Sequence, residues 1–159
     1  MTVKQIQPIG PVKFQDLATE RPVFQVPVDV EFQLDSGPKV QTIEIREPEQ
    51  TFTFDLPQEP KVVLFDRDTA VLKKLFFEKS VKQLTAQLQY MAGPAWHRGW
   101  AARQLAGSEE GVAALGAALT GDPSDRVRTL AAGALKETPF PVAGATLVLG
   151  LKKNANPRV

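Results

Sequence analysis

The chain has 159 residues, a length that suits one ordinary domain or two small ones, and 43% of its residues are hydrophobic. This content argues against a disordered polymer, and the balance of 19 basic and 18 acidic residues argues against nucleic acid or an acidic membrane surface as a partner. The sequence has no cysteine, so disulfides and thiolate metal sites are excluded and the redox compartment stays open.

The sequence contains no segment that predicts a membrane span. The longest apolar run, Phe140–Leu151, has about a dozen residues, whereas roughly 20 are needed to cross a bilayer. The N-terminal residues contain no apolar core of the length typical of a signal peptide. We therefore expect a soluble chain without a membrane partner, and we favour the cytoplasm while leaving the compartment open.

The first part of the chain, residues 1–79, carries the period of two that is typical of strands with one buried face. The longest alternating run is Phe24–Leu34, where six apolar side chains share one face and Pro27 lies on the other. Proline has no N–H to donate to a neighbouring strand, so Pro27 predicts an edge position or a bulge. Further strands are predicted at Thr2–Ile9, Val40–Arg46, Thr51–Leu56 and Val62–Phe65, and a loop is predicted at Val12–Arg21.

These strands predict an antiparallel β-sandwich of the immunoglobulin-like kind. About six strands are separated by turn signals, such as Asp35–Pro38, at intervals of roughly 8–12 residues. The uninterrupted apolar run Val62–Phe65 predicts a strand buried on both faces. A small barrel is the competing fold.

After residue 79 the period of the apolar residues changes to about 3.6, which is typical of helices. Ser80 is predicted to cap a helix that continues to Met91 and is stopped by Gly93 and Pro94. The apolar face of such a helix predicts packing against other helices.

An internal repeat follows. The pattern Arg-x-x-Ala-Ala-x-x-Leu begins at Arg98 and recurs thirty residues later at Arg128, and the helix predicted at Val112–Leu119 has its counterpart at Val142–Leu149. The period and the small alanines resemble HEAT-type repeats, in which each helix pair buries its apolar face against the next pair. A bundle of four or five helices with accidental similarity is the alternative.

The two parts together predict an α+β protein in segregated domains, with a β-sandwich over residues 1–79 and a HEAT-like helical segment over residues 80–159. The last residues, Asn154–Val159, are similar to Asp122–Val127, which leads into a repeat. We therefore expect the helical segment to be truncated and the chain to be a piece of a longer protein. A short frayed tail is the rival explanation.

The stretch Gln50–Ser80 connects the two parts and carries a family resemblance. Its pattern is Gln50-Thr-Phe-x-Phe, then Glu59-Pro-x-Val-x-x-Phe-Asp, then Val71-Leu-Lys and Phe77-x-Lys. It resembles the zinc aminopeptidases of the aminopeptidase N type, which are gluzincin metallopeptidases, at the end of the small β-sandwich that precedes their helical domain. The resemblance covers nearly the whole chain and implies the same order of sandwich and helical repeats.

The catalytic motifs of that family are missing from this sequence. Its zinc site needs a helix with H-E-x-x-H and a further glutamate, and its exopeptidase motif is G-x-M-E-N. The chain has one histidine, His97, and neither motif, so we assign no catalytic, cofactor-binding or metal-binding residue. His97 is predicted to be a surface or packing residue at a helix start. Asp66 and Asp68 are predicted to serve a turn rather than to act as an acid–base pair.

Two further groups of residues have both a structural and a functional interpretation. Trp96 and Trp100 are four residues apart and share one helical face, where they either fill the joint between the two domains, which we favour, or anchor a partner. Four basic residues near the boundary are predicted to form a solvated face rather than a binding patch. They are Lys73, Lys74, Lys79 and Lys82.

The resemblance implies a parent protein that removes N-terminal residues from peptides with one zinc ion. The present chain would be its non-catalytic C-terminal region, in which the sandwich braces the catalytic domain and the helical domain limits access to peptides. On this hypothesis the chain alone is inactive, the zinc belongs to the missing catalytic domain, and the partners are that domain and the peptide substrate. The alternative is a free-standing HEAT-repeat scaffold with a concave binding surface and no enzymatic activity.

Overall fold

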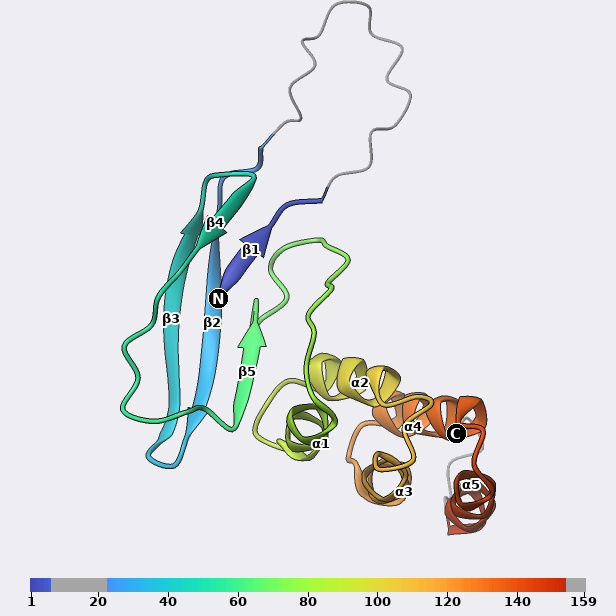
Figure 1. Cartoon of the computed structure of the whole chain (residues 1–159). Coiled ribbons are helices and arrows are strands. Elements are labelled where there is room, and N and C mark those ends of the chain that lie inside the picture. Colours follow the sequence, from blue (N-terminus) through green and yellow to red (C-terminus); the bar gives the residue numbers. More distant parts are fainter. Residues whose placement is uncertain (7–22, 154–159) are drawn as a thin grey trace, which may run out of the picture.

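The computed structural model describes residues 1–6 and 23–153, and within these ranges every strand precedes every helix (Figure 1). Five strands in two antiparallel sheets are followed by five packed helices, which confirms the α+β class. The strands are β1 (Thr2–Lys4), β2 (Val26–Leu34), β3 (Gly37–Ile45), β4 (Glu49–Thr51) and β5 (Val62–Phe65). The helices are α1 (Val81–Gln89), α2 (Ala95–Gln104), α3 (Val112–Gly121), α4 (Asp125–Glu137) and α5 (Pro141–Lys153).

Three predictions fall wholly or partly outside the described residues. The loop predicted at Val12–Arg21 and the repeat-like end Asn154–Val159 lie outside them altogether. The strand predicted at Thr2–Ile9 is present from Thr2 to Lys4, where β1 pairs antiparallel with β4, and its last residues also lie outside.

The larger sheet has the order β3–β2–β5, so β2 is its central strand. The prediction of an edge position or a bulge at Pro27 is therefore wrong for the strand as a whole, because the register of β2 with β3 is unbroken. Pro27 is tolerated because β5 pairs only with residues 30–33, so that among the strands that the structure describes β2 has a single neighbour at the proline. The strand begins at Val26, not at Phe24, whose side chain is 59% exposed.

Two apolar segments pack against this sheet without joining a strand ladder. Strand β4 ends at Thr51, so the strand predicted at Thr51–Leu56 is wrong over most of its length, although its apolar side chains are half-buried against the core of the sheet. Residues 71–79 also alternate between half-buried and exposed side chains, and no strand of the described chain pairs with them. The described strands are thus five, in sheets of two and three, rather than about six.

The helices form two rows. Figure 1 shows α1, α3 and α5 end-on in one row, with α2 and α4 in the other, and α2 packs against α4 while α3 packs against α4 and α5. The first helix begins as predicted, because the Ser80 hydroxyl accepts from the Gln83 N–H and the Gln83 side chain accepts from the Ser80 N–H. The copies of the thirty-residue pattern fall on α2 and α4, and the helices between them are α3 and α5.

A buried ion pair links the two copies of the pattern. Arg98 of α2 donates from Nε and Nη2 to the two carboxylate oxygens of Asp122 at 2.8 and 3.1 Å. The two side chains are only 5% and 0% exposed. Arg128, the counterpart of Arg98 in α4, donates to the backbone carbonyl of Asp122 at 2.6 Å. The turn between α3 and α4 is therefore fixed from both sides.

Most buried apolar residues of the described chain form two separate cores, one among the strands and one among the helices. Strand β5 lies between them, and its Val62 and Leu64 are buried where it contacts α1, so both faces of β5 are covered as predicted. Within the part of the chain that the structure describes, no helix combines the length and apolar character that a bilayer span requires. The division into domains at residues 79 and 80 stays a prediction.

Candidate functional site at the junction of strands and helices

Buried polar side chains gather where β5 and the residues after it meet α1 and α2, a region that we call the junction. Glu31 of β2 is 2% exposed, although it alternates with the apolar residues of the strand and shares the polar face with Pro27. Its carboxylate accepts a hydrogen bond from the Tyr90 hydroxyl at 2.7 Å and pairs with the Arg67 guanidinium. Burial and the bond to Glu31 raise the pKa of Tyr90 to about 12. Tyr90 ends α1, so one buried carboxylate joins the sheet to the first helix.

Asp66 shapes the turn that leaves β5. Its backbone lies in the left-handed region with a φ of 54°, and its carboxylate accepts from the N–H groups of Ala70 and Val71 at 2.9 and 3.1 Å. The same carboxylate pairs with the Lys73 amine. Burial alone would raise the pKa of Asp66, but the bonds from Lys73 and the two N–H groups outweigh it and lower the pKa overall. The predicted turn role of Asp66 is confirmed.

His97 is buried in the first turn of α2, where it is 2% exposed. Its Nε2 lies 3.3 and 3.1 Å from the carbonyl oxygens of Asp66 and Arg67, so the tautomer protonated at Nε2 donates to the turn after β5. Gln87 of α1 donates to the His97 carbonyl at 2.8 Å. Burial lowers the pKa of His97, which keeps the ring neutral near pH 7. His97 is therefore a packing residue, and the surface position is ruled out.

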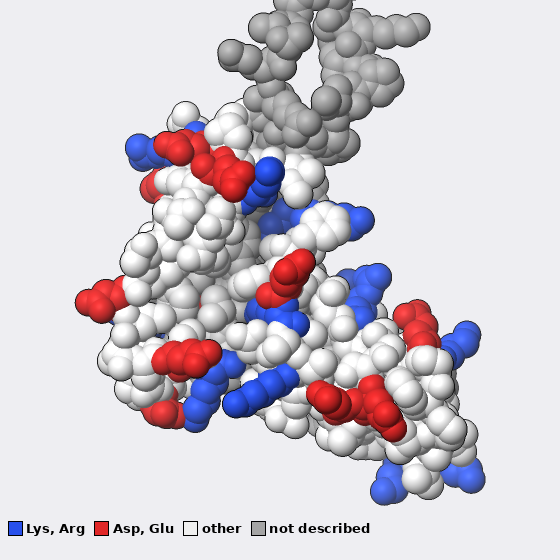
Figure 2. Space-filling model, viewed as in Figure 1, with Lys and Arg blue, Asp and Glu red and all other residues white. Residues whose placement is uncertain are grey.

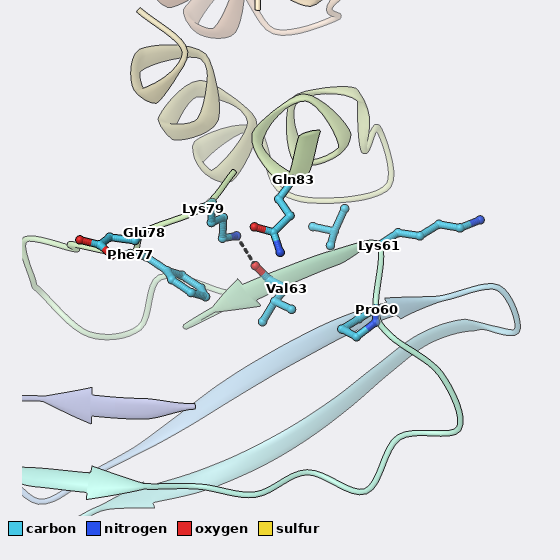
Figure 3. Close-up of a pocket in the computed structure, with 8 residues that line it drawn as sticks. Pro60, Lys61, Val63, Phe77, Glu78, Lys79 and Gln83 are labelled. Carbon is cyan, nitrogen blue, oxygen red and sulfur yellow. Dashed lines mark hydrogen bonds between the residues drawn. The ribbon is translucent and has the colours of Figure 1, made fainter. Parts of the chain in front are cut away.

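Lys79 joins β5 to α1 and α2 on another side of the junction. Figure 3 shows its amine aimed at the Val63 carbonyl, to which it donates at 2.5 Å, and it also donates to the Gln87 side chain. The amine lies 4.4 Å from the ring centre of Phe77 and 5.7 Å from that of Trp100. Burial lowers the pKa of Lys79 to about 8. The hollow beside it encloses about 60 Å³, which is far below the size of a typical ligand site.

A larger hollow of about 580 Å³ lies between α2, α4 and residues 73–75, and we call it the tryptophan groove. Its volume falls in the range of small-ligand sites. The residues of its lining that matter most below are Lys74, Trp96, Trp100, Arg103, Leu130 and Glu137. In the view of Figure 2, basic side chains lie over the region where strands and helices meet, with acidic side chains among them.

The structure brings together only some of the residues that the sequence singled out. Both tryptophans are half-buried, and the amines of Lys73 and Lys79 each lie 5.7 Å from one of their rings, which agrees with a place in the joint. The predicted solvated face is wrong for these two lysines, because each is largely buried and bound to a partner. Lys74 is exposed as predicted. Lys82 is exposed as well.

The aspartates at the turn have different neighbours. Asp68 is exposed and pairs with Arg67, whereas Asp66 is buried and pairs with Lys73. In residues 1–6 and 23–153, no group of three or more His, Asp or Glu side chains is arranged to hold a metal ion. The junction groups bind one another, and this arrangement supports a fixed link between two parts of the chain. The sequence near Glu31 does not indicate its burial, because its partners Arg67 and Tyr90 come from distant segments.

No protein-family model matches the chain, and no curated protein matches it.

Proposed function

We propose that the chain is the non-catalytic C-terminal region of an aminopeptidase N-like zinc metallopeptidase, where it braces the catalytic domain and limits the access of peptides. The pattern from Gln50 to Lys79 supports this proposal. The order of strands followed by helices is the order that the resemblance implies. Zinc belongs to the catalytic domain of the parent protein, and the partners are that domain and its peptide substrate.

The observation that carries the proposal is the polar junction. A brace must hold its two halves at a fixed angle, and directional hydrogen bonds fix an angle better than apolar contacts do. Here Glu31, Asp66 and Lys79 connect the sheet, the turn after β5 and the first two helices. A carboxylate that is 2% exposed tolerates little movement of its partners, because losing them would leave a buried charge unpaired.

The finer classification of the two halves belongs to the same proposal. We assign the strands to an immunoglobulin-like sandwich, because Val3 of β1, the strand that pairs with β4, packs against the core that is built on β2, β3 and β5. We assign the helices to HEAT-like repeats, supported by the thirty-residue offset between α2 and α4 and by the link from Arg98 to Asp122 at the start of the next pair.

A free-standing HEAT-repeat scaffold is the second candidate. The tryptophan groove favours it, because a hollow lined by two half-buried tryptophans is the kind of surface that anchors a partner. A scaffold of this kind would need no catalytic domain.

The length of the natural polypeptide separates the two candidates. Antibody detection of the protein in its own cells, followed by mass spectrometry, is expected to find a polypeptide much larger than 17.4 kDa that contains an H-E-x-x-H segment before the present sequence. A natural product of 17.4 kDa would support the scaffold and overturn the aminopeptidase proposal.

The catalytic claim has its own assay. The purified chain, incubated with zinc and aminoacyl-anilides, is expected to show no turnover above a protein-free blank, whereas the larger polypeptide is expected to hydrolyse them. Zinc-dependent turnover by the chain alone would overturn both candidates.

A further inference from the structure

We propose that the tryptophan groove is a docking site for an extended acidic polypeptide segment that carries a large apolar side chain. The proposal goes beyond the brace function because it gives the groove a ligand of its own. It rests on the geometry of the groove, and it applies both to a region of a larger enzyme and to a free-standing scaffold.

The floor of the groove is apolar and open. Trp96 and Trp100 lie one turn apart on α2, and Leu130 of α4 packs against the same helical core. The lining also includes a glycine of α4, Gly133, at which an added Cβ would have no heavy atom within 4 Å. Tryptophan offers a large contact area at low conformational cost, so this floor suits a bulky apolar side chain.

The border of the groove carries unpaired positive charge. Lys74 and Arg103 are exposed, and neither forms an ion pair within the described chain. Lys73 also lines the groove, but its amine is already bound to Asp66. Glu137 is the one acidic residue in the lining. The ammonium of Lys74, which lies 4.9 Å from the ring centre of Phe76, and the guanidinium of Arg103 would form charge-assisted hydrogen bonds with carboxylates, which are stronger than neutral ones.

The backbone beside the groove is available for pairing. Residues 71–79 alternate between half-buried and exposed side chains, as an extended strand does. No hydrogen bond from a backbone N–H of residues 72–79 is present within the described ranges. An extended peptide can pair with such a backbone in the manner of an added strand, while the side chains on one of its faces bind in pockets and give specificity.

A peptide fits this surface better than a single-stranded nucleic acid does. Aromatic rings and cations also bind single strands, through base stacking and phosphate contacts. However, Leu75 and Leu130 offer no stacking surface, and the chain as a whole has a net charge of only +1.

The chain supplies its own reporter for the test, because its two tryptophans both line the groove. We would titrate the purified chain with a capped hexapeptide of alternating Glu and Leu and follow tryptophan fluorescence. The control peptide alternates Gln and Leu, which keeps the shape and removes the charge. We expect saturable binding of the acidic peptide, with an affinity about tenfold higher than that of the neutral one, corresponding to roughly 1.4 kcal/mol.

Two pairs of variants test the assignment. Lys74→Gln combined with Arg103→Gln is expected to weaken the acidic peptide about tenfold, whereas Lys152→Gln on α5 leaves binding unchanged. Gly133→Leu is expected to fill the groove and abolish the fluorescence change. Gly144→Leu on α5 is its match, because a Cβ at Gly144 also has no heavy atom within 4 Å.

Each possible result of these experiments supports or overturns a stated part of the proposal. Absence of saturable change with either peptide up to about 1 mM overturns the docking site. Equal affinity for the acidic and neutral peptides would refute the preference for an acidic ligand. Unchanged binding by Gly133→Leu would refute the assignment of the site to the tryptophan groove. If an oligothymidylate binds more tightly than the acidic peptide, the ligand of the groove is a nucleic acid and the peptide proposal is wrong. None of these results depends on aminopeptidase activity, so the proposed function is judged separately.

Discussion

Neutralising Asp122 is expected to destabilise the protein strongly, because this carboxylate is fully buried against Arg98. Both of its oxygens are in use: Oδ2 accepts from Arg98 Nε, and Oδ1 accepts from Arg98 Nη2 and from the Ser124 N–H at 2.8 Å. In the variant Asp122→Asn the amide nitrogen must replace one of these oxygens. Whichever oxygen it replaces, an N–H donor then faces another donor.

The magnitude follows from the burial. Breaking a buried ion pair by removing one partner costs about 3–5 kcal/mol, because the remaining charge has no compensation. Arg98 would keep one amide oxygen and the Gly93 carbonyl, to which its Nη1 donates at 2.5 Å, but no negative charge would face it. A typical domain has a free energy of unfolding of roughly 5–15 kcal/mol, so the loss is a large part of the total. Urea denaturation followed by far-ultraviolet circular dichroism measures it directly.

The matched control is Asp125→Asn, which changes the net charge by the same amount. Asp125 is 59% exposed and pairs with Arg128 on the surface of α4, so its loss is expected to cost less than about 1 kcal/mol. In the double variant Arg98→Met, Asp122→Leu the buried charges are both gone, and part of the stability should return. If Asp122→Asn costs no more than Asp125→Asn, the reasoning from burial is wrong.

Three further outcomes are expected. Tyr90→Phe removes a hydrogen bond to the buried carboxylate of Glu31 and should lower the free energy of unfolding by about 1.5–3 kcal/mol in urea denaturation; an unchanged midpoint would contradict the link across the junction. Burial lowers the pKa of Lys79 to about 8, so between pH 8 and about 10.5 the unfolded chain binds more protons than the folded one. The free energy of unfolding should therefore rise by on the order of 2 kcal/mol between about pH 7.5 and 9.5. The variant Lys79→Met, measured at the same two pH values, should show a flatter dependence. Gly150→Ala should destabilise α5, because its new Cβ would collide with the side chain of a buried leucine of α3. Gly144→Ala on the same helix should instead stabilise the protein by about 0.8–1 kcal/mol in thermal melts. Equal effects of the two variants would refute the close approach of α5 to α3 at Gly150.

Local features of the fold were predictable because their causes are local. The cap at Ser80 depends on Gln83 three residues later, and both of its hydrogen bonds are present. The uninterrupted run Val62–Phe65 has no polar residue to face water, and β5 is buried on both faces. The Arg-x-x-Ala-Ala pattern at Arg98 and Arg128 located α2 and α4 through its offset alone.

The predictions that were wrong concern residues whose partners lie far away in the sequence. Glu31 alternates with apolar neighbours as a solvated residue would, and only Arg67 and Tyr90, brought in by the turn and by α1, explain its burial. Lys79 is buried for the same kind of reason, since its acceptors come from β5 and α1. The run Thr51–Leu56 shows the opposite error, because alternation reports which side chains are covered and not whether the backbone has a partner strand.

Pro27 illustrates how a central strand can stay partly open. Because β5 pairs with β2 only along residues 30–33, no strand of the described chain lies on that side of β2 at Pro27, and the missing N–H of the proline leaves no strand hydrogen bond unmade there. A proline on an unguarded strand end also discourages further pairing, so the residue protects the sheet from growing by association with another molecule. Pro27, which has no N–H to donate to a further strand, therefore also limits aggregation through this end of the strand.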